Sequence, residues 1–169
     1  VWKILSNSEG TFWGTYNGLF RMGGSLSDPN FEVIQVDGRF DNFFLCQDKI
    51  LVAEANQGLK VWENGKLSLI PGGDFFRDKE VVAVLPHSFQ GWLVLTRKEG
   101  IFHYQMDTIL PWAEDLTSYF SENLIYCGQT LRNGEIAVGT SQNGVLILSR
   151  DGTPLVRFNL QTGILNNSV

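Results

Sequence analysis

Four glycines, each followed by an apolar residue, divide the chain at nearly even intervals. They are spaced 40, 42 and 44 residues apart, at Gly18, Gly58, Gly100 and Gly144. A period of about 40 to 50 residues is typical of β-propeller repeats, in which each repeat forms one small sheet. The spacing therefore predicts four copies of one structural unit.

The sequence around each glycine predicts a four-stranded unit. The strand before the glycine is apolar almost throughout, which is typical of a strand covered on both faces. A second apolar strand follows the glycine, a more polar strand comes next, and a further strand precedes the whole pair. The two central strands of the four units are residues 12–13 and 19–22, 50–53 and 59–62, 92–95 and 101–104, and 136–138 and 145–148.

Turn and edge residues support this strand order. Asn64-Gly65 and Asp151-Gly152 are typical of tight hairpin turns, and Pro111, which has no N–H to donate, suits an outer edge strand. We therefore predict an all-β fold of four four-stranded antiparallel β-propeller blades, part of a larger ring of seven or eight blades. The predicted units are blade 1 at about 1–36, blade 2 at about 39–70, blade 3 at about 80–111, blade 4 at about 123–158, and the beginning of a further blade at 159–169.

Four blades do not close a ring of ordinary size, so the outermost blades are expected to expose apolar faces. Repeat arrays draw much of their stability from contacts between neighbouring repeats. We expect these faces to be covered either by further blades or by a second copy of the chain.

Composition excludes several kinds of partner. The formal net charge is −5 and no segment concentrates Lys and Arg, so direct binding to nucleic acid is not expected. No apolar run approaches the roughly 18 residues of a membrane span, and the first residues show neither an initiating Met nor a signal-peptide pattern, as expected of a segment of a longer protein. Cys46 and Cys127 lie in apolar strands and are expected to be buried thiols, although the sequence leaves their redox state open.

Two of the units carry a sequence motif that resembles the two-component-regulator propeller repeat. Residues 9–21 and 133–145 match its wording, Gly-x-Leu-Trp-Ile-Gly-Thr-x-x-Gly-Leu, and residues 162–169 resemble its later Thr-Gly-Leu-Pro-x-Asn-x-Val. The middle units depart from Gly-Thr, with Ala53-Glu54 and Leu95-Thr96. The resemblance implies the periplasmic sensor region of a bacterial hybrid histidine kinase, which detects carbohydrate and regulates transcription through a two-component system.

Connecting loops on one face of a propeller are where ligands usually bind, by analogy with the fold class. Two of these connections are long, 71–80 and 112–123, and both mix aromatic with charged residues. An aromatic ring beside polar groups suits a sugar, because the ring covers C–H groups while the polar groups bond hydroxyls. We therefore predict that an oligosaccharide ligand contacts a set of six residues: Tyr16, Phe76, Arg77, Arg97, Trp112 and Tyr119. The alternative is that these aromatic rings seal the ends of the blades.

The sequence does not favour catalysis, and it predicts no cofactor or metal. His87 is expected in a turn and His103 in a strand, with no spacing typical of metal ligands. The carboxylates of Asp74, Asp78 and Glu80 are expected to be solvated. A protein-binding scaffold is one alternative function. A propeller lyase or glycosidase is another, and it would require carboxylates that converge in one pocket.

Overall fold

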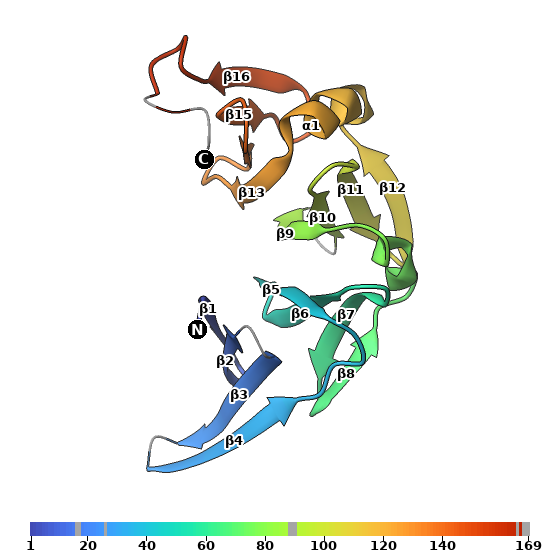
Figure 1. Cartoon of the computed structure of the whole chain (residues 1–169), viewed down its shortest axis with the longest axis vertical. Coiled ribbons are helices and arrows are strands. Elements are labelled where there is room, and N and C mark those ends of the chain that lie inside the picture. The colour runs from blue at the N-terminus through green and yellow to red at the C-terminus, as the bar shows by residue number, and fades with distance from the viewer. Residues whose placement is uncertain (16–17, 26, 88–90, 165, 167–169) are drawn as a thin grey trace. The chain divides into compact units, whose positions relative to one another are not determined.

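Four separate sheets, each of four antiparallel strands, make up the described part of the chain. This computed structural model describes residues 1–15, 18–25, 27–87, 91–164 and 166. In every sheet the neighbouring strands are consecutive in sequence. Figure 1 shows each sheet as such a meander. The all-β fold class is thereby confirmed, with sheets of the kind that form β-propeller blades.

The chain divides into two compact units, Val1–Asp78 and Lys79–Val169. Unit 1 holds blades 1 and 2. Their strands are β1 (Lys3–Asn7), β2 (Gly10–Thr15), β3 (Gly18–Ser25) and β4 (Asp28–Ile34), then β5 (Phe40–Cys46), β6 (Lys49–Glu54), β7 (Gly58–Glu63) and β8 (Lys66–Leu69).

Unit 2 holds blades 3 and 4, with strands of similar length. They are β9 (Val81–His87), β10 (Gly91–Thr96), β11 (Gly100–Gln105) and β12 (Thr108–Trp112), then β13 (Ile125–Thr130), β14 (Ile136–Thr140), β15 (Val145–Leu148) and β16 (Pro154–Phe158).

The predicted hairpin between β7 and β8 is confirmed. Asn64 and Gly65 have φ of 53° and 77°. Positive φ at both central residues defines the turn whose twist matches that of the flanking strands, and Asn-Gly adopts it at little cost. The turn fixes the register Glu63↔Lys66 and Trp62↔Leu67.

Each unit has its own apolar core between its two blades. In unit 1 the core contains Phe12, Leu19 and Ile34 from blade 1 and Phe43, Ile50, Val52 and Trp62 from blade 2. In unit 2 it contains Leu85, Leu93, Leu95 and Ile101 from blade 3 and Ile125, Ile136, Val138 and Leu146 from blade 4. Apolar strand residues on alternating positions therefore supply the contact between paired blades.

The Gly-Thr element of the repeat has a structural role. The threonine hydroxyl donates a hydrogen bond to the carbonyl of the turn glycine at Thr96–Gly100 (2.8 Å) and Thr140–Gly144 (2.9 Å), and more weakly at Thr15–Gly18 (3.3 Å). It closes the turn between the second and third strands. Blade 2 has Glu54 in place of this threonine.

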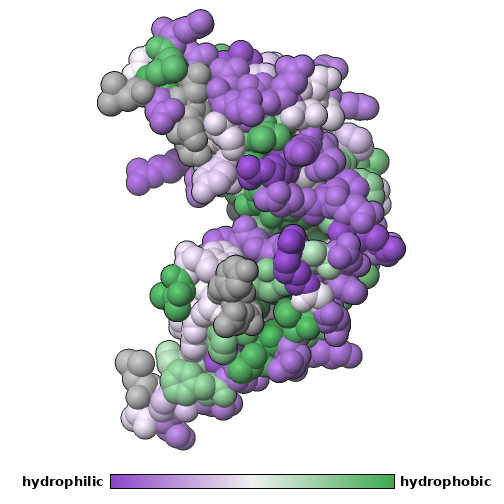
Figure 2. Space-filling model, in the orientation of Figure 1, coloured by the Kyte–Doolittle hydropathy of each residue, from purple (hydrophilic) through white to green (hydrophobic). Residues whose placement is uncertain are grey.

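The outward face of blade 1 is apolar and exposed. Trp13 stacks on Phe20 with ring centroids 6.0 Å apart and meets Phe31 edge-on at 6.2 Å. Ile4 and Phe31 are each 63% exposed. Figure 2 shows hydrophobic residues on the part of the surface that β2 to β4 occupy in Figure 1.

Two connections expected as loops contain short helices. The first includes the 3₁₀ helix η1 (Gly73–Phe76), and the second includes the 3₁₀ helix η2 (Glu114–Leu116) and the α-helix α1 (Thr117–Asn123). Helical turns satisfy backbone groups locally in a long connection. The sequence does not indicate these short helices, because the two segments lack the apolar periodicity of a longer helix.

Candidate functional site

The connections of unit 2 bring several of the predicted residues onto one surface. Arg97 lies in the β10–β11 turn, where its backbone N–H donates to the Glu80 carbonyl (2.8 Å) and its carbonyl accepts from Ile125 (2.9 Å). Leu124, next to Ile125 in the chain, accepts from the Ser141 N–H (2.9 Å) in the turn of blade 4. The turns of blades 3 and 4 are thus linked through the residues that follow α1.

Arg97 carries the charge on this surface. Its guanidinium Nη1 lies 3.6 Å from Oε1 of Glu80, and the Glu80 side chain is largely exposed. A pair this open to water is weak, so both groups remain available to other polar partners.

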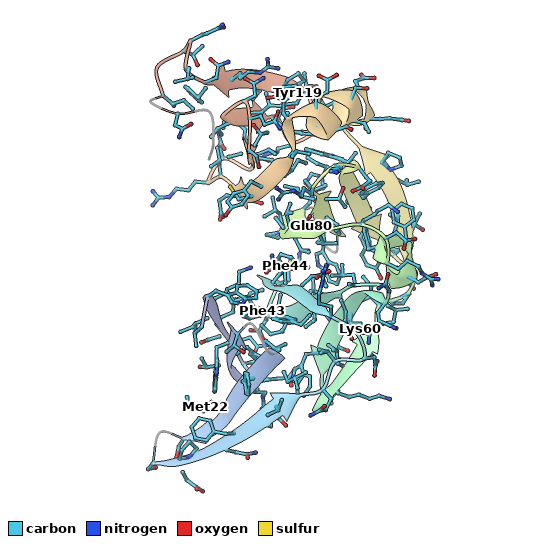
Figure 3. All side chains as sticks on the ribbon, viewed as in Figure 1. Met22, Phe43, Phe44, Lys60, Glu80 and Tyr119 are labelled. Atoms are coloured by element: carbon cyan, nitrogen blue, oxygen red, sulfur yellow. The ribbon has the colours of Figure 1, made fainter. Side chains whose placement is uncertain are left out.

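Tyr119 projects from α1 against blade 4. The Arg157 guanidinium lies 4.5 Å from the centroid of the Tyr119 ring, a cation–π contact between α1 and β16. Figure 3 labels Tyr119 beside α1. Burial raises the pKa of the Tyr119 phenol, although the positive charge of Arg157 opposes that shift. The phenol oxygen is buried beside the Thr140 side chain, whose hydrogen bond also opposes the rise in that pKa. Tyr119 is partly buried against the core of unit 2, and it brings an aromatic ring next to the guanidinium of Arg157.

Two amide side chains lie in blade 4, the blade whose Arg157 contacts Tyr119. The Asn159 side chain donates to Oδ1 of Asn143 (3.2 Å), and the Asn143 N–H donates to the Thr140 hydroxyl (3.0 Å). Asn143 lies in the β14–β15 turn, and Asn159 directly follows β16. Aromatic, guanidinium and amide groups together can bind a polar ligand with exposed C–H faces.

Trp112 ends β12 and is only partly available to a ligand. It packs against the apolar core of unit 2, and its ring lies 5.6 Å from that of His87. This position fits the alternative in which aromatic residues seal the blade.

The predicted residues of unit 1 do not form a comparable surface. The Phe76 ring is 2% exposed and therefore lies in the interior, contrary to the expectation of a surface residue. Arg77 is exposed and lies beside Asp74 one helical turn earlier, with 3.4 Å between Nη2 and Oδ2. Tyr16 lies outside the described residues.

The two histidines meet, which the sequence did not indicate. His87 is the last residue of β9 rather than part of a turn, and its ring contacts that of His103 with centroids 5.0 Å apart. The strand register places both residues on one face of blade 3, since His87 lies opposite Gly91 and His103 lies opposite Leu93, two residues further along β10. Burial lowers the pKa of both residues, and the neighbouring His103 lowers that of His87 further. Across the described ranges, no group of three or more His, Cys, Asp or Glu side chains is arranged to hold a metal ion.

Of the two cysteines, only Cys46 matches the expectation of a buried thiol. Burial raises its pKa to about 12. Cys127 is exposed, whereas the next residue, Gly128, faces Leu95 and Leu85 of blade 3.

A buried ion pair in blade 2 was also missed. The Lys60 ammonium lies 2.7 Å from Oε2 of Glu54 and 2.8 Å from Oδ2 of Asp37, and the other Glu54 oxygen accepts a hydrogen bond from the Gly38 N–H. Burial tends to lower the pKa of Lys60, but the hydrogen bonds and charges of Asp37 and Glu54 outweigh it and raise that pKa. The available signal was Glu54, a carboxylate where the repeat has threonine.

Comparison with known proteins shows the fold alone. No family model matches the chain, and a search of curated proteins finds no match. The chain is similar in structure to the extracellular domain of the hybrid two component system BT3049 of B. thetaiotaomicron, with a TM-score of 0.64 and 15% identity over 98% of this chain and 23% of that one.

A second similar structure is the extracellular domain of the one component system BT4673 of the same organism. Its TM-score is 0.50 with 12% identity, over 92% of this chain and 31% of that one. The chain thus spans less than a third of either neighbour. In the described part of the chain, no helix is long and apolar enough to cross a membrane.

Proposed function

We propose that the chain is a ligand-sensing, extracytoplasmic β-propeller segment of a two-component receptor, located in the periplasm, and that its ligand is a carbohydrate. The observation that carries this proposal is the similarity of nearly the whole chain to the extracellular domain of a hybrid two component system. The motifs at residues 9–21 and 133–145 support it independently, because their resemblance to the two-component-regulator propeller repeat lies in the amino-acid sequence alone.

The connecting surface of unit 2 is the proposed carbohydrate site. Tyr119 offers a ring for the C–H face of a sugar, while Arg97, Arg157 and Asn143 offer donors and acceptors for hydroxyls. Binding would be transmitted by rigid-body movement of blades or rearrangement between subunits, a common route in receptors.

The proposal is tested by screening the purified chain against immobilised oligosaccharides and measuring the best ligand by calorimetry. Replacing Tyr119 with Ala is expected to weaken binding at least tenfold. Tyr126→Ala is the matched control, because Tyr126 is an exposed tyrosine on strand β13 instead of a connection. Unchanged affinity in a folded Tyr119→Ala variant would rule out this surface.

A protein-binding scaffold is the second candidate, favoured by the exposed apolar face of blade 1 around Phe31. Remaining blades of the same receptor, or a second copy of the chain, would cover such a face. Light scattering separates these cases: a dimer supports the second copy, whereas a monomer that binds a partner protein but no glycan supports the scaffold.

We also propose that the segment is not an enzyme. The carboxylate of Asp74 lies beside Arg77 and that of Glu80 beside Arg97, and pairing with a cation favours the ionised form rather than the raised pKa that a general acid needs. Release of unsaturated or reducing sugars on incubation with oligosaccharides would overturn this.

A further inference from the structure

We infer that a second binding site, for a single uncharged sugar or a similar small polyol, lies at the outer rim of unit 1 between blades 1 and 2. A cavity of about 290 Å³ is present there. It is lined by Glu32 and Ile34 of β4, by Asp37 of the following connection, by Lys60 and Trp62 of β7, and by Lys66 after the β7–β8 turn. The inference goes beyond the proposed function, because this rim is separate from the connecting surface of unit 2.

Comparison of the four blades shows that blade 2 is modified at this place. Lys60 lies two residues after the turn glycine, where the other blades have Phe20, Phe102 and Leu146. Glu54 replaces the threonine that closes the turn. An ordinary blade would have a large apolar side chain and a hydroxyl here, and blade 2 instead has a buried pair of opposite charges. Figure 3 labels Lys60, which belongs to β7.

Stability does not explain this replacement. Removing two charges from water costs more than their attraction commonly returns, so well-packed apolar residues at the same positions are often equally or more stable. Departures from an otherwise consistent pattern are found chiefly at functional sites. The ion pair of Glu54 and Lys60 is therefore best explained by binding.

The cavity contains polar groups with unused capacity. Trp62 lines the cavity and is 4% exposed, and its buried indole Nε1–H has no acceptor within the described residues. An ammonium group has three N–H donors, and among the residues that the structure describes Lys60 pairs with two carboxylates, Glu54 and Asp37. Asp37 is largely exposed and its carboxylate can accept further hydrogen bonds.

The arrangement favours a neutral hydroxyl-rich ligand over an ion. The cavity walls carry two carboxylates, Glu32 and Asp37, and two ammonium groups, Lys60 and Lys66, so their charges balance. Hydroxyls both donate to carboxylates and accept from N–H groups, as this mixture requires. The volume is slightly below the roughly 300–1,000 Å³ of sites for drug-sized ligands, which limits the occupant to about one sugar ring.

The test uses the purified chain and a panel of free monosaccharides, D-glucose, D-galactose, D-mannose, D-xylose and L-arabinose, with sodium phosphate and sodium glucuronate as anionic probes. Saturation-transfer NMR detects binding, and tryptophan fluorescence measures affinity. We expect at least one neutral sugar to bind. Trp62→Phe, which keeps an aromatic ring but removes the N–H, should weaken binding at least fivefold.

A second test uses the double variant Glu54→Thr/Lys60→Phe, which gives blade 2 the two residue types that blade 3 has at the matching positions. It is expected to fold, as judged by circular dichroism, and to abolish monosaccharide binding, while oligosaccharide binding at Tyr119 is unchanged. If only the anionic probes bind, or if the double variant binds sugars normally, the inference is wrong. If oligosaccharides bind but no monosaccharide does, the rim site fails and the proposed function stands; if no glycan of either kind binds, both fail.

Discussion

The ammonium group of Lys60 lies 2.7 Å from a Glu54 carboxylate whose side chain is entirely buried. A charge in this position is tolerated only while its partner is present, because the unpaired group would be left in an apolar environment without water. The ion pair of Lys60 and Glu54 is therefore expected to determine the stability of unit 1 as well as ligand binding at the proposed rim site.

Replacing Lys60 with Met is expected to destabilise the chain by about 3–5 kcal/mol, because this is the usual effect of removing one member of a buried ion pair and leaving the other charge unpaired. Urea unfolding followed by fluorescence measures this difference. Lys49→Met is the control, since it removes the exposed pair with Glu63 and should cost no more than about 1 kcal/mol. Equal effects of the two substitutions would contradict the role assigned to burial.

Gly58→Ala is expected to destabilise unit 1 strongly. Gly58 has φ of +112°, and an added Cβ would lie 2.2 Å from the Gly73 carbonyl oxygen, so the η1 connection must move. Gly65→Ala has similar backbone strain at φ +77° but meets open space, and should cost about 1 kcal/mol. Thermal unfolding of both variants compares them, and a Gly58→Ala variant as stable as the Gly65→Ala variant would exclude the close approach.

Acid is expected to destabilise unit 2 through the two histidines. Burial lowers the pKa of both His87 and His103 from the ordinary value of 6.5, so the unfolded chain binds protons more readily than the folded one. Their contribution is complete above about pH 6.5 and decreases as the pH falls below it. The double variant His87→Gln/His103→Gln should show a smaller fall in Tm between pH 7.5 and 5.5. An identical fall in Tm in the unmodified chain and in the double variant would show that these histidines do not cause the acid destabilisation.

One thiol is expected to react rapidly with a disulfide reagent at pH 8. Cys127 is exposed, whereas Cys46 is buried and its pKa is raised to about 12, which leaves almost no thiolate. Spectrophotometry of thiol release counts the fast sites, and Cys127→Ser should remove the fast phase. Protection of Cys127 in a longer receptor would indicate that another blade covers this face of blade 4.

The fold was predictable because its determinants are local. Asn64-Gly65 specifies a hairpin, and the apolar strands around Gly58 and Gly100 specify buried inner strands, whatever lies further along the chain. The short helix α1 was not predictable in this way, since its seven residues are held by packing of Phe120 and Tyr119 and do not show an extended apolar pattern.

Side-chain chemistry was less accessible to sequence reasoning. Phe76 and Tyr119 both lie in aromatic connections, yet Phe76 is buried and Tyr119 contacts Arg157, a distinction set by tertiary packing. The contact between the rings of His87 and His103 depends on strand register, which the amino-acid sequence does not show directly. Glu54 departs visibly from the repeat, but its pairing with Lys60 is set by the tertiary structure.

The restriction of every sheet to consecutive strands has a consequence for synthesis in the cell. Paired strand residues that lie far apart in the sequence, such as Leu19 and Ile34 or Val81 and Thr96, are still separated by only 15 positions. A ribosome adding roughly 5–20 residues per second needs about two seconds or more to supply 40 residues. A hairpin closes in about 1–10 μs. Hydrogen-bonding partners for each nascent sheet are therefore in place long before the next sheet has been translated, which limits the time during which unpaired edges are exposed to other chains.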